Sequence, residues 1–257
     1  MKKLTLMNMS VALFAVLMLA IPARAQNFSN GGFESGDTSG WTQGGGYWGT
    51  PFSAPAPSTY LPGGSNYYLS GTAITVVSQG SDPYSGLNMV YSDKYSARVN
   101  DDNNNYSVSV LSQTVNNYSK SNIYFAWAAV LEGSHSVGDS DYFALQLTDD
   151  TKGTDLINVS YDSASAATAS LFNDTVGVFW TPWQIENLDV SANMGDTLTL
   201  TLLASDCPYG GHWGYVYLDG FGAAPPPPTT TPEPDSFLLL GTGMLGLAGL
   251  MLRKVLA

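Results

Sequence analysis

Alternation of large apolar residues with smaller or polar ones is the feature that most restricts the fold of this sequence. In residues 142–148 three large apolar residues occupy every second position, and residues 197–202 and 214–219 show the same period. A period of two over four to eight residues is typical of a half-buried β-strand. Between the two ends of the chain we find no clear helical period, so we predict an all-β protein.

Residues 123–131 form a nearly continuous apolar run, which predicts a central strand buried on both faces. Clusters of Gly, Asn, Asp and Ser, such as 100–105 and 133–140, separate the strands and favour turns. Residues 44–68 combine three consecutive glycines with four prolines and six aromatic residues. We expect them to form an extended loop that lies over the β-strands. Many short strands with polar turns predict a jelly-roll-like β-sandwich.

The N-terminal end has the composition of a secretory signal. Lys2 and Lys3 precede an apolar run at 11–21, and Pro22 then interrupts any helix before the small residues of Ala23–Ala25. This order of basic, apolar and small residues predicts a signal helix in residues 1–25, removed by signal peptidase. An uncleaved anchor is the alternative, and Pro22 argues against it.

The C-terminal end predicts a linker followed by a membrane-spanning helix. Residues 225–235 are rich in Pro and Thr, with four consecutive prolines that favour an extended polyproline conformation. Residues 236–257 contain a sixteen-residue uncharged run, closed by Arg253 and Lys254. Because basic residues prefer the cytoplasmic side, the rest of the chain is expected outside the cytoplasm.

Pro232, Glu233 and Pro234, followed by the apolar run and by Arg253 and Lys254, resemble the PEP-CTERM sorting tail. The resemblance implies export from a Gram-negative bacterium and a transient inner-membrane anchor. It further implies processing by exosortase, with delivery to the cell surface or an exopolysaccharide matrix. A plain C-terminal anchor is the alternative.

The balance of acidic and basic residues limits the kinds of molecule that the protein can bind. Residues 26–234 hold four basic residues against twenty acidic ones, a balance that repels nucleic acid and suits a protein that binds divalent cations. Cys207 is the only cysteine, so an internal disulfide and a multi-thiolate metal cluster are both excluded.

Two segments of the predicted sandwich domain, residues 26–224, resemble the first and last strands of galactose-binding-like jelly rolls, a fold of many carbohydrate-binding modules. They are Asn30–Glu34 with Gly40-Trp41, and 211–219. The resemblance implies a structural Ca²⁺ shared by Glu34 and Asp219. Gly220 stands where many relatives have a second Asp, which is a departure from the pattern of the resemblance. The alternative role for Glu34 and Asp219 is a strand-end cap or a surface charge.

Exposed Trp or Tyr rings can stack on sugars. In the predicted loop 44–68, the candidate residues for such a platform are Trp48, Tyr60, Tyr67 and Tyr68. The alternative is that these rings are buried over the core.

Catalytic chemistry has little support in the sequence. Cys207 and His212 are five residues apart, but the Pro and Gly between them indicate a turn over a packed cysteine. A zinc site would need His135, His212 and carboxylates, which the spacing does not suggest. The neighbouring carboxylates are expected to be solvated turn residues, and they are found at 101–102, 139–141 and 149–150.

We therefore expect a non-catalytic surface or matrix protein that contacts polysaccharide. The alternatives are a structural or adhesive protein that binds other proteins, and an extracellular hydrolase.

Overall fold

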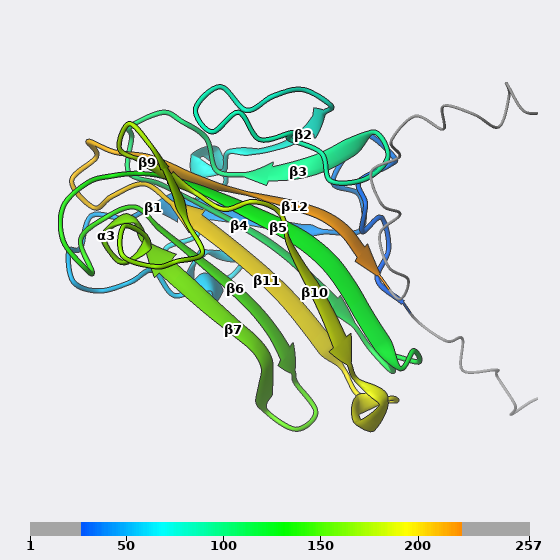
Figure 1. Ribbon diagram of the computed structural model, residues 1–257. Coiled ribbons are helices and arrows are strands. Elements are labelled where there is room, and N and C mark those ends of the chain that lie inside the picture. Colours follow the sequence, from blue (N-terminus) through cyan, green and yellow to red (C-terminus); the bar gives the residue numbers. More distant parts are fainter. Residues whose placement is uncertain (1–26, 223–257) are drawn as a thin grey trace, which may run out of the picture.

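The computed structural model describes residues 27–222. They form a β-sandwich of two antiparallel sheets, as the alternation predicts, with jelly-roll-like connections between distant strands (Figure 1). The five-stranded sheet has the order β1 (Thr42–Tyr47), β4 (Ser107–Val115), β11 (Leu198–Ser205), β6 (Tyr142–Asp149) and β7 (Thr154–Asp162).

The seven-stranded sheet has the order β2 (Ile74–Ser78), β3 (Tyr95–Val99), β12 (Gly214–Gly222), β5 (Asn122–Glu132), β9 (Val178–Trp180) and β8 (Asn173–Thr175). The seventh strand, β10 (Gln184–Asp189), also pairs with β5. Short helical turns lie between strands: α2 (Pro57–Tyr60), η1 (Leu69–Gly71), α3 (Ser163–Ala166) and η2 (Ser191–Asn193).

The main core lies between the sheets, where the large apolar members of each alternating run point inward. Leu145 of β6 and Leu202 of β11 are fully buried, and so are Phe125 of β5 and Leu218 of β12. β5 pairs with three other strands and is buried over most of its length, which confirms the predicted central strand.

The region 44–68 is only partly the loop that its composition predicts. Gly44 to Tyr47 belong to β1, which pairs with β4 over its whole length. A Cβ on Gly44 would collide with the backbone of Tyr60, and one on Gly46 would collide with that of Asn66. The glycines therefore allow the following loop to lie directly on the strand, so the expectation of a loop from residue 44 is wrong.

The opening segment 29–40 is a series of turns rather than a strand. Asn30 and Phe33 both have positive φ angles, 49° and 58°, which extended strands do not accommodate. The segment nevertheless lies beside β12, as the resemblance implied, because Phe221 N donates to Gly31 O at 3.0 Å.

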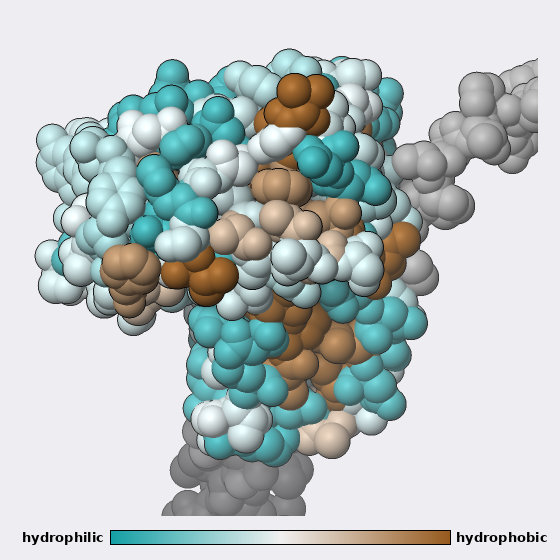
Figure 2. Space-filling view, turned by 60° about the vertical axis from the view of Figure 1, so that its left-hand side comes forward, coloured by the Kyte–Doolittle hydropathy of each residue, from teal (hydrophilic) through white to brown (hydrophobic). Residues whose placement is uncertain are grey.

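Among residues 27–222, no helix is long and apolar enough to cross a membrane. The predicted signal helix, the linker and the C-terminal helix lie outside the described residues. Figure 2 shows one face of the molecule, on which apolar side chains gather in a central band with hydrophilic side chains on both sides.

Candidate functional site

Asp219 is a buried carboxylate with one oxygen left unpaired. It lies near the end of β12 and is fully buried. Its Oδ2 accepts hydrogen bonds from the N–H groups of Tyr91 and Ser92, each at 2.9 Å. Its Oδ1 is buried and has no side-chain or backbone hydrogen-bond partner among residues 27–222. Burial raises the pKa of Asp219 to about 7, and the nearby charge of Glu34 contributes to the rise.

Glu34 lies next to this unpaired oxygen. A Cβ built on Gly32 would be 3.7 Å from Glu34 Cγ and 3.8 Å from Asp219 Oδ1, so one glycine borders both carboxylates. The Oε1 atom of Glu34 accepts the N–H groups of Lys94 and Tyr95, which leaves Oε2 free of such bonds. Hard carboxylate oxygens with unused acceptor capacity, on two residues that border the same glycine, are ligands that Ca²⁺ prefers, although it also requires carbonyl or water ligands.

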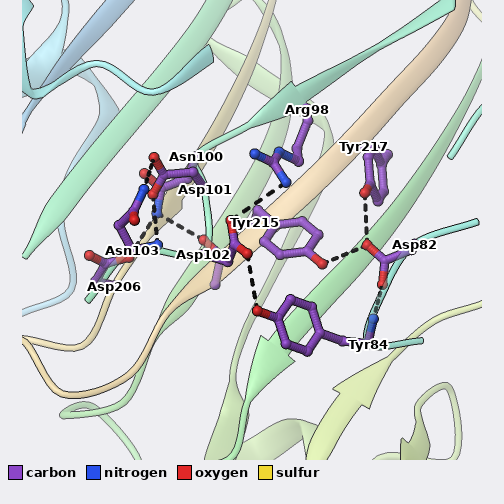
Figure 3. A network of polar contacts seen from close by, with 11 residues as sticks. Asp82, Tyr84, Arg98, Asn100, Asp101, Asp102, Asn103, Asp206, Tyr215 and Tyr217 are labelled. Atoms are coloured by element: carbon purple, nitrogen blue, oxygen red, sulfur yellow. Dashed lines mark hydrogen bonds and ion pairs between the residues drawn. The ribbon is translucent and has the colours of Figure 1, made fainter. Parts of the chain in front are cut away.

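The outward face of the seven-stranded sheet is covered by the loop 79–94. Asp82 in this loop is buried, and its Oδ2 accepts the hydroxyls of Tyr215 and Tyr217 on β12, at 2.5 and 2.8 Å. Figure 3 shows the two rings converging on Asp82, while Tyr84 of the same loop donates to Asp102. Burial opposes ionisation of Asp82, but these bonds and those from Ser85 outweigh it and lower its pKa.

Apolar contacts complete the cover on this face. Trp213, Tyr215 and Tyr217 pack with apolar residues of the loop and of neighbouring strands, and Trp183 Nε1 donates to the carbonyl oxygen of Asn88 at 2.9 Å. The part of this face around Tyr215 and Tyr217 is therefore not an open platform.

The outward face of the five-stranded sheet is covered over only part of its length. Trp48 and Tyr60 are 3% and 2% exposed, because they pack on Val108, Val110 and Leu203 of the sheet. The expectation that these two rings form a surface platform is wrong. The glycine-rich strand leaves room for these large rings to lie on the sheet. They are therefore buried, which is the alternative given in the sequence analysis.

Tyr68 is the one exposed member of the predicted platform, at 54%, and Tyr67 is half-buried. Tyr47, at 51% exposed, lies beside Tyr68 with 5.8 Å between the ring centroids. Tyr47 is not among the predicted platform residues, and its place at the end of β1 leaves its ring exposed. Tyr47 and Tyr68 form an exposed aromatic pair at the β1 edge of the sandwich.

The uncovered part of the five-stranded sheet forms a groove of about 430 Å³ between the sheet and the segment around α2. We call it the β6/β11 groove. Pro57 and Leu61 give it an apolar wall, and its floor is polar. It is lined by Ala56, Pro57, Ser58, Leu61, Gln146, Thr148, Asp150, Thr199 and Thr201.

The floor of the groove carries a row of hydroxyl, amide and carboxylate groups. Thr199 donates to Asp150 at 2.6 Å, and Thr148 donates to Asp155 at 3.0 Å. Gln146 lies two residues from Thr148 on β6, opposite Thr201 of β11, and is half-buried. Its amide makes no hydrogen bond within residues 27–222. It is therefore available to a ligand.

The expectation that the neighbouring carboxylates are solvated turn residues is wrong for three of them. Asp141 and Asp149 are fully buried, and Asp139 is 6% exposed. The Oδ1 atom of Asp139 accepts the N–H and hydroxyl of Ser136, so it caps a loop. Within the described chain they do not converge on a shared cleft.

Cys207 is packed under a turn, as expected, but it is not alone there. His212 lies beside it, and His135 comes from a different loop to contact the same sulfur. The sequence analysis missed this grouping, because His135 is 72 residues away in the chain and no local spacing indicates it.

Comparison with known families identifies a PEP-CTERM protein-sorting motif at residues 230–254. The match includes Pro232, Glu233, Pro234, Arg253 and Lys254 of the predicted sorting motif, which lie outside the described structure. No curated protein sequence matches this chain.

Several solved structures match this chain at low similarity. A complex of TmCBM61 with β-1,4-galactotriose has 15% identity and a TM-score of 0.39, and the match covers 76% of this chain and 96% of that one. The CBM22-1 xylan-binding domain of Paenibacillus barcinonensis Xyn10C has 14% identity and a TM-score of 0.32, covering 77% and 91%. The enzymatically active domain of bacteriophage CBA120 tailspike protein 4 has 11% identity and a TM-score of 0.36, covering 75% and 20%.

These structural similarities are too distant to assign a ligand or an activity. The sorting motif, by contrast, is a direct sequence match and marks an exported protein. The chain is therefore a β-sandwich protein that carries a PEP-CTERM sorting motif near its C-terminus.

Proposed function

We propose that this protein is a non-catalytic surface or matrix protein that binds a neutral polysaccharide in the β6/β11 groove. The observation that carries the proposal is the uncovered groove itself, with the free amide of Gln146 on its floor and Pro57 and Leu61 on its wall. Sugars present hydroxyls for the polar floor and C–H faces for an apolar wall. Asp150 and the acidic balance of the chain disfavour an anionic polymer.

The same groove argues for binding rather than hydrolysis. A glycosidase that uses the common mechanism needs two carboxylates across the scissile bond. Among the described residues that line the groove, Asp150 is the one carboxylate, and it is hydrogen-bonded to Thr199. We therefore propose that the extracellular hydrolase alternative does not apply to this groove.

The exposed pair Tyr47 and Tyr68 is a second surface suited to sugar stacking, at the β1 edge. Their rings offer an apolar face with a polar tip, which suits contact with a wet polymer. We propose that this pair is an accessory contact for a long chain.

The test is affinity electrophoresis of the full chain, solubilised in mild detergent, in gels that contain neutral or anionic polysaccharides, including the host matrix polymer. Retardation by a neutral polymer is expected. Gln146→Ala should weaken binding about five- to tenfold, as expected for loss of one hydrogen bond. Asn187→Ala, an exposed amide on the opposite sheet, is the matched control. Absence of retardation in every gel, or equal retardation of Gln146→Ala, would overturn the proposal.

We further propose that exosortase processes the C-terminal tail after signal peptidase has removed residues 1–25, with a transient inner-membrane anchor between the two steps. The sorting motif supports this route. Replacing Pro232, Glu233 and Pro234 with Ala should leave a larger, membrane-bound form in fractionated cells of the native host. An unchanged size and location would favour a plain anchor.

We also propose that Glu34 and Asp219 hold a structural Ca²⁺ that fixes the opening segment against β12. The support is the unpaired, buried Oδ1 of Asp219 beside Glu34. Bound there, the ion would supply positive charge where two carboxylates meet.

A further inference from the structure

Three soft or borderline metal ligands converge at the end of the sandwich where β11 and β5 finish. Cys207 Sγ lies 3.7 Å from His135 Nε2 and 3.7 Å from His212 Nδ1. All three ligand atoms lie within 4.8 Å of one another. We propose that Cys207, His135 and His212 form a Zn²⁺ site with one thiolate and two imidazole ligands.

The distances agree with zinc geometry. In a tetrahedral site, Zn–S is about 2.3 Å and Zn–N about 2.0–2.1 Å, so a sulfur and a nitrogen ligand lie about 3.5 Å apart. Both sulfur–nitrogen distances in the structure are close to this value. The rings of His135 and His212 are nearly perpendicular, at 85°, with centroids 4.8 Å apart. Because the ligand atoms lie within 4.8 Å of one another and His135 is exposed, we expect its ring to rotate toward a bound ion.

The backbone around Cys207 is organised to hold a thiolate. Its N–H donates to the carbonyl oxygen of His212 at 3.0 Å, which fixes the loop that carries both ligands. The N–H of Gly211 donates to Sγ at 3.4 Å. Such N–H···S contacts stabilise a metal-bound thiolate.

Neighbouring residues anchor the same loop. Asp206, immediately before Cys207, accepts the amide of Asn100 at 3.0 Å (Figure 3). It also accepts the N–H groups of Asn105 and Ser107. On the other side, Tyr209 packs its ring edge-on to His135, with 4.8 Å between centroids. The loop that carries Cys207 and His212 is therefore held in place by the fold, and exposed His135 is the ligand that must adjust.

Access to the site and the type of its ligands also favour a zinc ion. Cys207 is fully buried, His212 is half-buried and His135 is exposed, so an ion can enter from the side of His135. Among the described residues, no carboxylate belongs to this group. The fourth position of a tetrahedral ion is therefore expected to hold water. Sulfur and nitrogen ligands select zinc over Ca²⁺, which prefers oxygen.

The test is titration of the full, reduced chain with Zn²⁺ in competition with a chromogenic chelator, and with Co²⁺ followed by absorption. We expect one equivalent of Zn²⁺ and a thiolate-to-Co²⁺ charge-transfer band. His135→Ala removes an exposed ligand without disturbing the core, and should weaken Zn²⁺ binding by at least about 100-fold, the upper end of the loss caused by removing an outer partner of a metal ligand.

Val137→Ala, an exposed residue of the same loop, is the matched control and should bind Zn²⁺ as the parent does. Cys207→Ser should abolish the charge-transfer band, and Asp219→Asn should leave it unchanged. Absence of Zn²⁺ binding by the parent would overturn the proposal, and so would equal affinity of His135→Ala. Tight binding of copper with weak binding of zinc would likewise contradict it.

Discussion

Phe221 N donates a hydrogen bond to Gly31 O at 3.0 Å, which joins the opening segment of the described chain to its last strand. The Phe221 ring packs edge-on to Phe28, with centroids 4.2 Å apart, so the contact continues into the core. The position of Glu34 next to Asp219 depends on this closure, because Gly31 and Phe221 flank the two carboxylates in the chain.

Gly31→Ala should destabilise the protein, since a Cβ at this position would collide with the carbonyl group of Phe221. The expected loss is about 1–3 kcal/mol, as for overpacking of a dense core. Denaturant unfolding measures it. Gly49→Ala is the control, because a Cβ there meets no atom within 4 Å. Equal stability of the two variants would contradict this expectation, because it would mean that the opening segment can move away from Phe221 at no cost in stability.

Removal of Ca²⁺ should lower the melting temperature of the full chain. At a Ca²⁺ concentration about 100 times Kd, binding contributes about 2.7 kcal/mol, or roughly 5–10 °C for a domain of this size. Asp219→Asn should abolish the difference between Ca²⁺ and chelator, whereas Asp189→Asn, an exposed carboxylate on β10, should preserve it. An equal melting temperature of the parent protein with Ca²⁺ and with chelator would refute the proposed site.

Asp82→Ala should destabilise the protein by about 2–4 kcal/mol, because it leaves the hydroxyls of Tyr215 and Tyr217 buried without their acceptor. Tyr217→Phe removes one of the two bonds, and its expected loss is smaller, about 1–2 kcal/mol. Chemical unfolding monitored by tryptophan fluorescence compares the three proteins. A larger loss for Tyr217→Phe than for Asp82→Ala would contradict this account.

Asp149 should make stability fall in strong acid. Burial favours its neutral form, but the amide of Asn193, the N–H of Lys152 and the Lys152 ammonium lower its pKa to about 2. An acid with a lowered folded pKa stabilises the fold above its ordinary value of 3.8, and this contribution disappears as the pH falls toward 2. In unfolding experiments at a series of pH values, the free energy of unfolding of Asp149→Asn should therefore fall less steeply below pH 4 than that of the parent.

Asp141 should act in the opposite direction. Burial raises its pKa well above 3.8, although the hydroxyls of Ser163 and Ser134 partly oppose the rise. The folded protein therefore keeps the proton longer than the unfolded chain, so stability declines as the pH rises above about 4. Asp141→Asn should reduce this decline in the same unfolding series. A steeper decline in the variant would show that the carboxylate is ionised in the fold.

Local sequence patterns predicted the strands well. The alternation in residues 142–148 corresponds to β6, and the apolar run 123–131 corresponds to β5, because each strand displays its period within its own residues. Glycines 44–46 misled the analysis, since a glycine-rich segment resembles a loop until the chain that lies on it is known.

The sequence by itself determined the all-β class and the sorting motif at 230–254, because both are written in neighbouring residues. Only the tertiary structure decided that Trp48 is covered, that Gln146 is free, and that His135 meets Cys207. Burial and convergence depend on contacts between residues distant in the chain, and the free energy of packing the whole sandwich selects those contacts. A local pattern carries no record of them.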